Sequence, residues 1–385
     1  MIYLDNAATS FPKPERVYEA MDQFARTSLG NPGRSGHRLA VGSEQVLDEV
    51  RHLLNQLFNG ESPERFILTF NCTDGLNMAI KGVLNDGDHV ITTVLEHNSV
   101  SRPLVAMERA GRIELTRVPC DAYGFVDPDE IARSVRPNTR LIVMTHASNV
   151  LGTVQPIAEV GRIARERDLL FLVDAAQTAG VVPIDVRAMC IDLLAFPGHK
   201  ALYGPTGTGG LYVGPRAKLR PWREGGTGGD SSSPTQPEEL PYYLEGGTPN
   251  VHGVVGLREG IRYVLDVGMD KIRNHELDLV EQVVAWAEQE EHFQVLGRFD
   301  RHSHVGTLSL HCDLLPAQDV GQILDEAFEI AIRPGLHCAP YAHRQFGTFP
   351  DGTIRISPGA FNTEEDIATL CDALAYIARE AVQLF

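Results

Sequence analysis

The sequence is short of basic charge and of long apolar runs. Its 385 residues carry 34 Lys and Arg against 51 Asp and Glu, which is a formal net charge of −17. A chain this acidic lacks the basic surface that attracts nucleic acids or anionic membranes, so we expect neither as a main partner. No apolar run approaches the roughly 20 residues that a membrane-spanning helix needs, so we expect no membrane insertion.

Cysteine is scarce as well, and no two cysteines are spaced as C-x-x-C. This spacing argues against a zinc knuckle or a redox dithiol, and we expect no metal site. The opening MIYLDNAATS has no basic segment followed by an apolar one, so we expect no secretory leader. Free thiols persist in reducing compartments, and we therefore predict a cytoplasmic protein. The six are Cys72, Cys120, Cys190, Cys312, Cys338 and Cys371.

The composition is that of an ordinary globular protein, with 43% hydrophobic and 22% charged residues. Short, continuous apolar runs in the middle of the chain are typical of strands buried on both faces. Helical patterns separate several of them, and this alternation predicts an α/β fold with a mostly parallel, seven-stranded sheet. The expected strands are Phe66–Phe70, His89–Val94, Ile113–Val118, Leu141–Thr145, Leu169–Asp174, Leu193–Phe196 and Gly210–Val213. The expected helices are Asp74–Val83, Val100–Arg109, Asp129–Val135 and Ile157–Arg167.

The last third of the chain has a different pattern. Residues 225–249 are rich in Gly, Ser, Pro and Thr, and they predict a long loop. A helical stretch follows from Gly253 to about Glu290, with a break near Gly268. We expect a large domain at residues 13–255 and a small α+β domain that combines residues 1–12 with 256–385. The small domain's expected elements are strand Gly306–His311, helix Ala317–Glu329, strands Ile330–Arg333 and Thr353–Ser357, and helix Glu364–Ala381.

Polar residues that follow the predicted strands indicate a ligand site, because ligands of such sheets bind at the carboxyl ends of the strands. Lys200, in GHKALYGPTG, is a candidate Schiff-base nucleophile, although a lysine in a turn can also be a plain surface residue. Asp174, with Gln177 three residues later, ends an apolar strand. Its carboxylate could pair with a protonated pyridine ring or simply cap a helix.

Two further residues fit the same site less specifically. Thr73 lies in the turn NCTDGLN at a predicted helix start, where free backbone amides form a phosphate site, although Thr there is often only a cap. His97 follows another strand, in LEHNS, and is either structural or placed for ring stacking and proton transfer.

The motifs together resemble a family. YLDNAATS, NPGRSGH, NCTDGLN, LEHNS, HASNVLGT, VDAAQTAG, GHKALYGPTG, EGGTPN, RPGLHCAP and IRISPGAFNT occur in the order and spacing of cysteine desulfurases and selenocysteine lyases. These enzymes are class-V aminotransferase relatives with the fold-type I architecture and a pyridoxal 5'-phosphate cofactor. The resemblance spans nearly the whole chain.

The resemblance implies a role for each matching residue. Lys200 would hold the cofactor covalently, Asp174 would keep its ring nitrogen protonated, and His97 would stack on the ring and move protons. The remaining cofactor contacts would come from Thr73 and His199 at the phosphate, Gln177 at the phenolic oxygen and Asn149 beside cofactor and substrate. Arg355 would bind the substrate carboxylate. Thr248, in GGTPN, would reach the cofactor of a neighbouring subunit, which implies a homodimer.

Cys338 distinguishes the desulfurases within this family. It lies in RPGLHCAP, directly after His337 and near Arg333, and a positive setting favours a thiolate. It could instead be a plain buried cysteine. The pattern resembles the second, short-loop type of desulfurase, in which this cysteine takes sulfur from L-cysteine as a persulfide and L-alanine is released. A sulfur acceptor, such as an acceptor protein, would then be needed.

Three positions depart from the family pattern, and other activities remain open. Pro197 and Cys72 stand where many relatives have serine and threonine, so we expect the phosphate contacts to differ from those of many relatives. Leu336 replaces a second histidine and could change substrate preference. The alternatives are a selenocysteine lyase, a cystine C–S lyase, a true aminotransferase, and a silent scaffold that binds a sulfur-transfer partner.

Overall fold

The computed structural model describes residues 1–33, 36–228 and 232–384. A seven-stranded sheet forms its centre, in the order β2-β8-β7-β6-β5-β3-β4. Only β8 runs antiparallel to its neighbours β2 and β7, and the other pairs are parallel. The strands are β2 Phe66–Thr69, β3 Asp88–Thr93, β4 Ile113–Val118, β5 Thr139–Thr145, β6 Leu170–Asp174, β7 Leu193–Pro197 and β8 Gly209–Val213.

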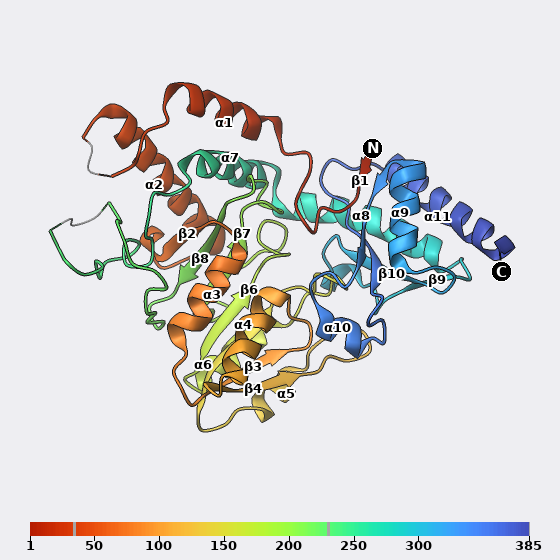
Figure 1. Ribbon diagram of the computed structural model, residues 1–385, viewed down its shortest axis with the longest axis horizontal. Coiled ribbons are helices and arrows are strands. Elements are labelled where there is room, and N and C mark those ends of the chain that lie inside the picture. Colours follow the sequence, from red (N-terminus) through yellow and green to blue (C-terminus); the bar gives the residue numbers. More distant parts are fainter. Residues whose placement is uncertain (34–35, 229–231, 385) are drawn as a thin grey trace.

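Helices cover both faces of this sheet (Figure 1). Neighbouring residues of one strand point to opposite sides, so Val90 packs in one hydrophobic core and Ile91 in another. This explains why the strands read as continuous apolar runs. One face carries α3 Cys72–Val83 and α4 Asn98–Arg109. The other carries α2 Arg38–Phe58, α5 Pro128–Arg133, α6 Ile157–Glu166 and α7 Val251–Val267.

A smaller α+β unit contains a four-stranded antiparallel sheet, β12-β13-β10-β9. The N-terminal segment belongs with it, because β1 Ile2–Tyr3 pairs with β11 Ile330–Ala331 and Leu4 is buried in its core. Its elements are α8 Met269–Ala287, β9 Phe293–Val295, β10 Leu308–Cys312, α9 Ala317–Phe328, β12 Arg333–Gly335, α10 Pro340–Gln345, β13 Thr353–Ile356 and α11 Glu364–Leu384.

The expected α/β fold with seven central strands is confirmed, as is the helix break at Gly268, which has φ +92°. The expected strand Ile330–Arg333 is wrong. The run divides into β11 and β12, because its first half pairs with β1 and its second half with β13. The expected strand Gly306–His311 begins two residues later, at Leu308.

Several elements were not anticipated from the sequence. They are helix α1 Glu15–Thr27, helices α2 and α10, and the short strands β1 and β9, together with the 3-10 turns Pro63–Arg65 and Arg301–Ser303. In the predicted loop, residues 225–228 and 232–249 contain no helix or strand, and residues 229–231 lie outside the described residues. Among the described residues, no helix is long and apolar enough to cross a membrane. The division into domains at residue 255 stays a prediction.

Candidate active site

The carboxyl ends of four neighbouring strands meet at one edge of the central sheet. Asp174 is the last residue of β6, and Lys200 follows β7 by three residues. His97 and Asn149 each follow their strands, β3 and β5, by four residues. Parallel strands end at the same edge, so residues far apart in sequence come together there.

A cavity of about 190 Å³ lies at this edge. It brings together eight of the ten site residues that the sequence predicted, while Cys338 and Thr248 lie elsewhere. Arg333 and His337 also line it, although the sequence had indicated them only as neighbours of Cys338. The eight are Thr73, His97, Asn149, Asp174, Gln177, His199, Lys200 and Arg355.

Asp174 is a buried carboxylate that is bonded on one side only. It is 2% exposed, and its Oδ1 accepts hydrogen bonds from the Ala176 backbone N–H at 2.9 Å and from Cys72 Sγ at 3.5 Å. No described residue donates to Oδ2. Burial raises the pKa of Asp174, and it also raises the pKa of the Cys72 thiol, which therefore stays protonated and donates. A cationic N–H group bound in the cavity would give Oδ2 of this carboxylate a hydrogen-bond donor.

Lys200 presents an amine that is ready to react. Its Nζ has no hydrogen bond or ion pair with a described residue. Burial, together with the nearby positive charge of Arg355, lowers the pKa of Lys200 to about 8, and Asp174 partly opposes that shift. A lysine in this state loses its proton far more readily than a lysine in water, as a nucleophile or base requires.

His97 is a neutral imidazole with a defined tautomer. It caps helix α4, and its Nδ1 accepts from the Ser99 backbone N–H at 3.0 Å, so Nε2 carries the proton. Burial and the charge of Lys200 lower the pKa of His97 to about 4. The Ser99 hydroxyl lies 2.7 Å from the hydroxyl of Thr73, and this contact links His97 to the neighbouring helix α3.

The N-terminus of helix α3 forms the anion-binding end of the cavity. Asn71 caps it by accepting the Asp74 backbone N–H at 2.9 Å, and Thr73 follows in the first turn. First-turn amides have no carbonyl partner within the helix, and the helix dipole favours negative charge there. His199 lines the same cavity, and its buried Nδ1 has no hydrogen-bond partner among the residues that the structure describes.

Arg355 is fully buried, at 1% exposure, and is held from two sides. Its NH2 group pairs with Asp5 at 2.6 Å, and its NH1 group donates to the Asn149 carbonyl at 3.1 Å. Asn149 in turn donates from Nδ2 to the His337 carbonyl at 2.6 Å. Sequence reasoning missed Asp5, whose only signal was its place inside the motif YLDNAATS.

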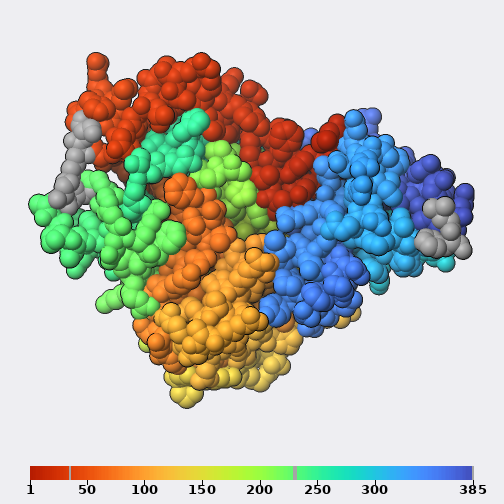
Figure 2. Space-filling model, viewed as in Figure 1, coloured from red at the N-terminus to blue at the C-terminus, as the bar shows by residue number. Residues whose placement is uncertain are grey.

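Cys338 lies outside this cavity, in a neighbouring groove of about 510 Å³ between α4 and α10. The groove is lined on its charged side by arginines and, among the described residues, by no Asp or Glu. Figures 1 and 2 show the two elements meeting where the orange and blue parts of the chain adjoin. Its lining residues are Asn98, Ser101, Arg102, Val105, Ala106, Arg109, Leu336, Cys338, Pro340, Tyr341 and Arg344.

Two consecutive left-handed residues place the Cys338 thiol at this position. His337 has φ +49° and Cys338 has φ +58°, a conformation that costs energy outside glycine and is concentrated at functional sites. Arg333 NH2 lies 3.7 Å from Cys338 Sγ, as the sequence had suggested. The Cys338 carbonyl accepts from the Asn98 backbone N–H at 2.7 Å, which ties the turn to the start of α4.

A short chain of histidines supports the same turn. His337 Nε2 lies 2.9 Å from the Arg333 carbonyl, and His337 Nδ1 lies 3.3 Å from His343 Nε2. His343 Nδ1 continues to the Thr348 hydroxyl at 2.8 Å. Because His337 faces the cavity and Cys338 the groove, this single turn joins the two sites.

Comparison with known proteins places this geometry in a family. Residues 2–370 match the class-V aminotransferase family. The chain belongs to that family. A probable cysteine desulfurase of Methanothermobacter thermautotrophicus is 36% identical over 383 residues, which cover 98% of this chain and 94% of the relative.

Solved structures of class-V enzymes have the same fold. The apo structure of a cysteine desulfurase from Thermococcus onnurineus NA1 matches with a TM-score of 0.92 at 30% identity, over 98% of this chain and 95% of that one. The cysteine desulfurase CsdA of Escherichia coli matches with a TM-score of 0.88 at 29% identity, over 100% and 95%. The fold-type I expectation and the assignment to the cysteine desulfurase branch are therefore confirmed.

Class-V family members use pyridoxal 5'-phosphate, and the cavity residues fit that group. The Asp174 carboxylate accepts hydrogen bonds from described residues at Oδ1 only, so its Oδ2 suits a protonated ring nitrogen. The Lys200 amine, which has no partner among the described residues, suits an aldehyde. The α3 N-terminus and the unpaired His199 Nδ1 suit a phosphate. Gln177, whose Nε2 donates to the Ala7 carbonyl at 3.1 Å, keeps its amide oxygen free for the cavity.

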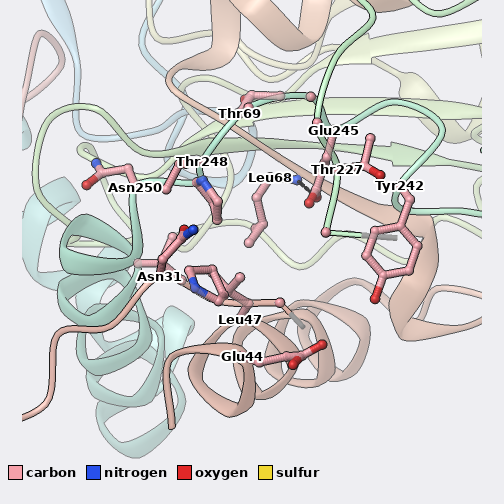
Figure 3. Close-up of a pocket in the computed structure, with 18 of the residues that line it drawn as sticks. Asn31, Glu44, Leu47, Leu68, Thr69, Thr227, Tyr242, Glu245, Thr248 and Asn250 are labelled. Atoms are coloured by element: carbon pink, nitrogen blue, oxygen red, sulfur yellow. Dashed lines mark hydrogen bonds between the residues drawn. The ribbon is translucent and has the colours of Figure 1, made fainter. Parts of the chain in front are cut away.

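Thr248 lines a different pocket, of about 420 Å³, on the side of the molecule formed by α2 and the loop after β8. Figure 3 shows Thr248 there, with Asn31, Asn250 and Glu245 around the same space. Glu245 accepts the Leu68 backbone N–H at 2.7 Å. Within one chain Thr248 does not line the Lys200 cavity, so its predicted cofactor contact concerns a second subunit and stays a proposal.

Proposed function

We propose that this chain is a pyridoxal 5'-phosphate-dependent cysteine desulfurase, which converts L-cysteine to L-alanine and carries the sulfur as a persulfide on Cys338. One observation supports this most: the turn His337–Cys338 joins a cavity suited to the cofactor to a groove that holds a thiol. An aminotransferase has no use for Cys338, and a silent scaffold has no use for the Lys200 amine.

Each cavity residue has a task in this reaction. Arg355 binds the substrate carboxylate through Nε, which has no partner among the described residues, and Asn149 borders the same cavity. When bound, pyridoxal 5'-phosphate would supply an electron sink for the substrate Cα, and Asp174 would keep its ring nitrogen protonated. Lys200 anchors the group and takes the Cα proton. The Cys338 thiolate then attacks the substrate sulfur: an S–S bond forms, the C–S bond breaks, and the carbon gains a proton.

The decisive experiment follows sulfur and carbon in the same sample. Purified protein that contains the cofactor is treated with L-cysteine, alanine is quantified, and the Cys338 peptide is weighed by mass spectrometry. We expect one added sulfur atom that a reductant removes. An unmodified Cys338 during alanine production would sink the proposal. Pyridoxamine phosphate and a keto acid would indicate an aminotransferase instead, and strong preference for selenocysteine or cystine would indicate the corresponding lyase.

We propose further that the sulfur acceptor reaches Cys338 through the groove. Arg102, Arg109 and Arg344 are exposed around it, and they favour an acceptor thiol with nearby carboxylates. Persulfide transfer to glutathione should slow in Arg102→Ala, while transfer to uncharged mercaptoethanol should not. Arg162→Ala, a surface arginine on α6, is the matched control. Equal slowing with both thiols would contradict a role for charge.

We also propose a homodimer in which Thr248 contacts the partner's cofactor, and a reducing, cytoplasmic setting. The pocket around Thr248 supports the first, since it opens a surface that a second chain could complete. The six free cysteines support the second. Sedimentation of the active protein as a monomer would contradict the dimer.

A further inference from the structure

A second, smaller cavity lies beside Lys200. Its volume is about 40 Å³, and it shares Ala7, Ala176, Gln177 and Lys200 with the cofactor cavity. Lys200 therefore borders both spaces. The smaller one extends to Glu276 on helix α8, in the C-terminal α+β unit. A buried water occupies roughly 10–15 Å³ by this measure, so about three waters fit in the space that Lys200 and Glu276 both line.

Glu276 is a buried carboxyl group without a structural explanation. It is 8% exposed, and no described residue forms a hydrogen bond or ion pair with it. Burial alone raises the pKa of Glu276 to about 8, so it carries a proton at neutral pH. A buried, unpaired carboxyl group costs stability, and such groups concentrate where they have a chemical task.

Glu96 provides a direct contrast. It is even more deeply buried, at 1% exposure, and burial likewise raises its pKa to about 8. Glu96, however, accepts hydrogen bonds from the Thr93 hydroxyl at 2.7 Å and the Thr145 backbone N–H at 3.1 Å, and it lines neither cavity. The role of Glu96 is to hold the loop after β3, and nothing comparable accounts for Glu276.

The surroundings keep the Glu276 carboxyl group in place. A side chain at Gly306 would meet Glu276 Cβ at 2.6 Å and Oε2 at 2.9 Å, so this glycine leaves the space that Glu276 occupies. The titratable groups that face it are Tyr203 and Tyr263, whose own pKa values are raised by burial and then by Glu276, and Lys200 across the small cavity. Neither tyrosine ionises at neutral pH, so Lys200 is the group with which Glu276 can exchange a proton.

We propose that Glu276 is a proton reservoir that acts through Lys200, with water in the small cavity as the path. This proposal rests on the proposed desulfurase function. Each turnover consumes two S–H bonds and forms one S–H bond and one methyl C–H bond, so a proton moves from sulfur to carbon. The Glu276 O–H proton passes through water to Lys200 and from there to the carbon that loses sulfur. The Glu276 carboxylate then takes a proton from solvent, and solvent receives the proton that the thiol has lost.

The test follows an isotope through the product. Cysteine that carries deuterium at Cα is turned over in ordinary water, and the deuterium kept in alanine is measured by mass spectrometry. With the reservoir, the Lys200 proton mixes with solvent protons, so little deuterium stays. In Glu276→Gln, we expect several-fold more deuterium in alanine and slower turnover with an unchanged KM. Glu96→Gln is the matched control and should keep the wild-type retention, while Glu276→Asp should restore most of the exchange.

A cofactor-free measurement separates this proposal from the proposed function. Since folding raises the pKa of Glu276, its contribution to stability is present below about pH 4.5 and is lost as the pH rises to about 8. Unfolding of the apo protein should show this loss in the wild type and not in Glu276→Gln. Wild-type deuterium retention in Glu276→Gln would overturn the reservoir. Absence of any alanine would overturn the desulfurase function, and the apo measurement would still report whether Glu276 is protonated.

Discussion

The cavity around Lys200 and the groove around Cys338 share one turn but differ in construction. Strand ends and a helix start build the cavity, and its Asp174 and Arg355 are almost fully buried. The groove lies between two surface helices, and its arginines Arg102 and Arg344 are exposed. Proton removal from carbon gains from a buried site, where burial lowers the pKa of Lys200 to about 8 and that of His97 to about 4. Sulfur must leave the protein, so its carrier needs access to another molecule.

Replacement of Lys200 should have the largest effect, because it removes the anchor and the base of the closed site. We expect Lys200→Ala to lower alanine production by on the order of 10⁴-fold, the upper end for general-base catalysis. Lys81→Ala, on helix α3, is the control. Normal alanine production by Lys200→Ala with intact cofactor would show that the cavity is not the reaction site.

Replacement of Cys338 should separate the two regions. Cys338→Ala leaves the cavity residues in place, so we expect cofactor binding and its absorbance change with L-cysteine to persist, while sulfur release falls below detection. Turnover of selenocysteine can survive in part, since selenium is the better leaving group. Cys371→Ala, on helix α11, should behave as the wild type. Loss of cofactor binding in Cys338→Ala would show that cavity and groove are not separable.

Acid should weaken the chain of histidine hydrogen bonds that holds the Cys338 turn. Burial lowers the pKa of His343 from 6.5 to about 4, so the unfolded chain binds a proton that the folded one resists. The contribution of His343 is present above pH 6.5 and is lost as the pH falls to 4, by at most about 3 kcal/mol. Urea unfolding at pH 7 and 4.5 should show a smaller loss in His343→Asn than in the wild type. An equal loss in both would contradict this source, and His302→Asn is the exposed control.

The smallest effect should come from Thr248, which lies apart from both regions. If it donates one hydrogen bond to a partner's cofactor, Thr248→Ala removes about 1 kcal/mol, or roughly a fivefold change in affinity. Titration of the apo protein with pyridoxal 5'-phosphate measures this change, with Thr235→Ala as the control. Unchanged affinity would remove Thr248 from the cofactor site.

Local patterns accounted for much of the fold and of the cavity. The seven central strands were readable because strands buried on both faces are apolar throughout. Eight of ten predicted site residues share one cavity: seven belong to motifs at the carboxyl ends of central-sheet strands, which meet at one edge, and Arg355 reaches the cavity from β13. Helix α1, with Val17 as its one buried residue, and the split between β11 and β12 were not readable, since they depend on partners far along the chain.

The sequence by itself determined the α/β class, the family motifs and the chemistry that Lys200, Asp174 and Cys338 can offer. These follow from short-range order: apolar runs, turn residues and fixed spacings within one segment. Only the tertiary structure decided that Asp5 pairs with Arg355, that Cys338 faces a groove and not the cavity, and that Glu276 shares a space with Lys200. Burial and contact between distant segments set these relations, and no local pattern records them.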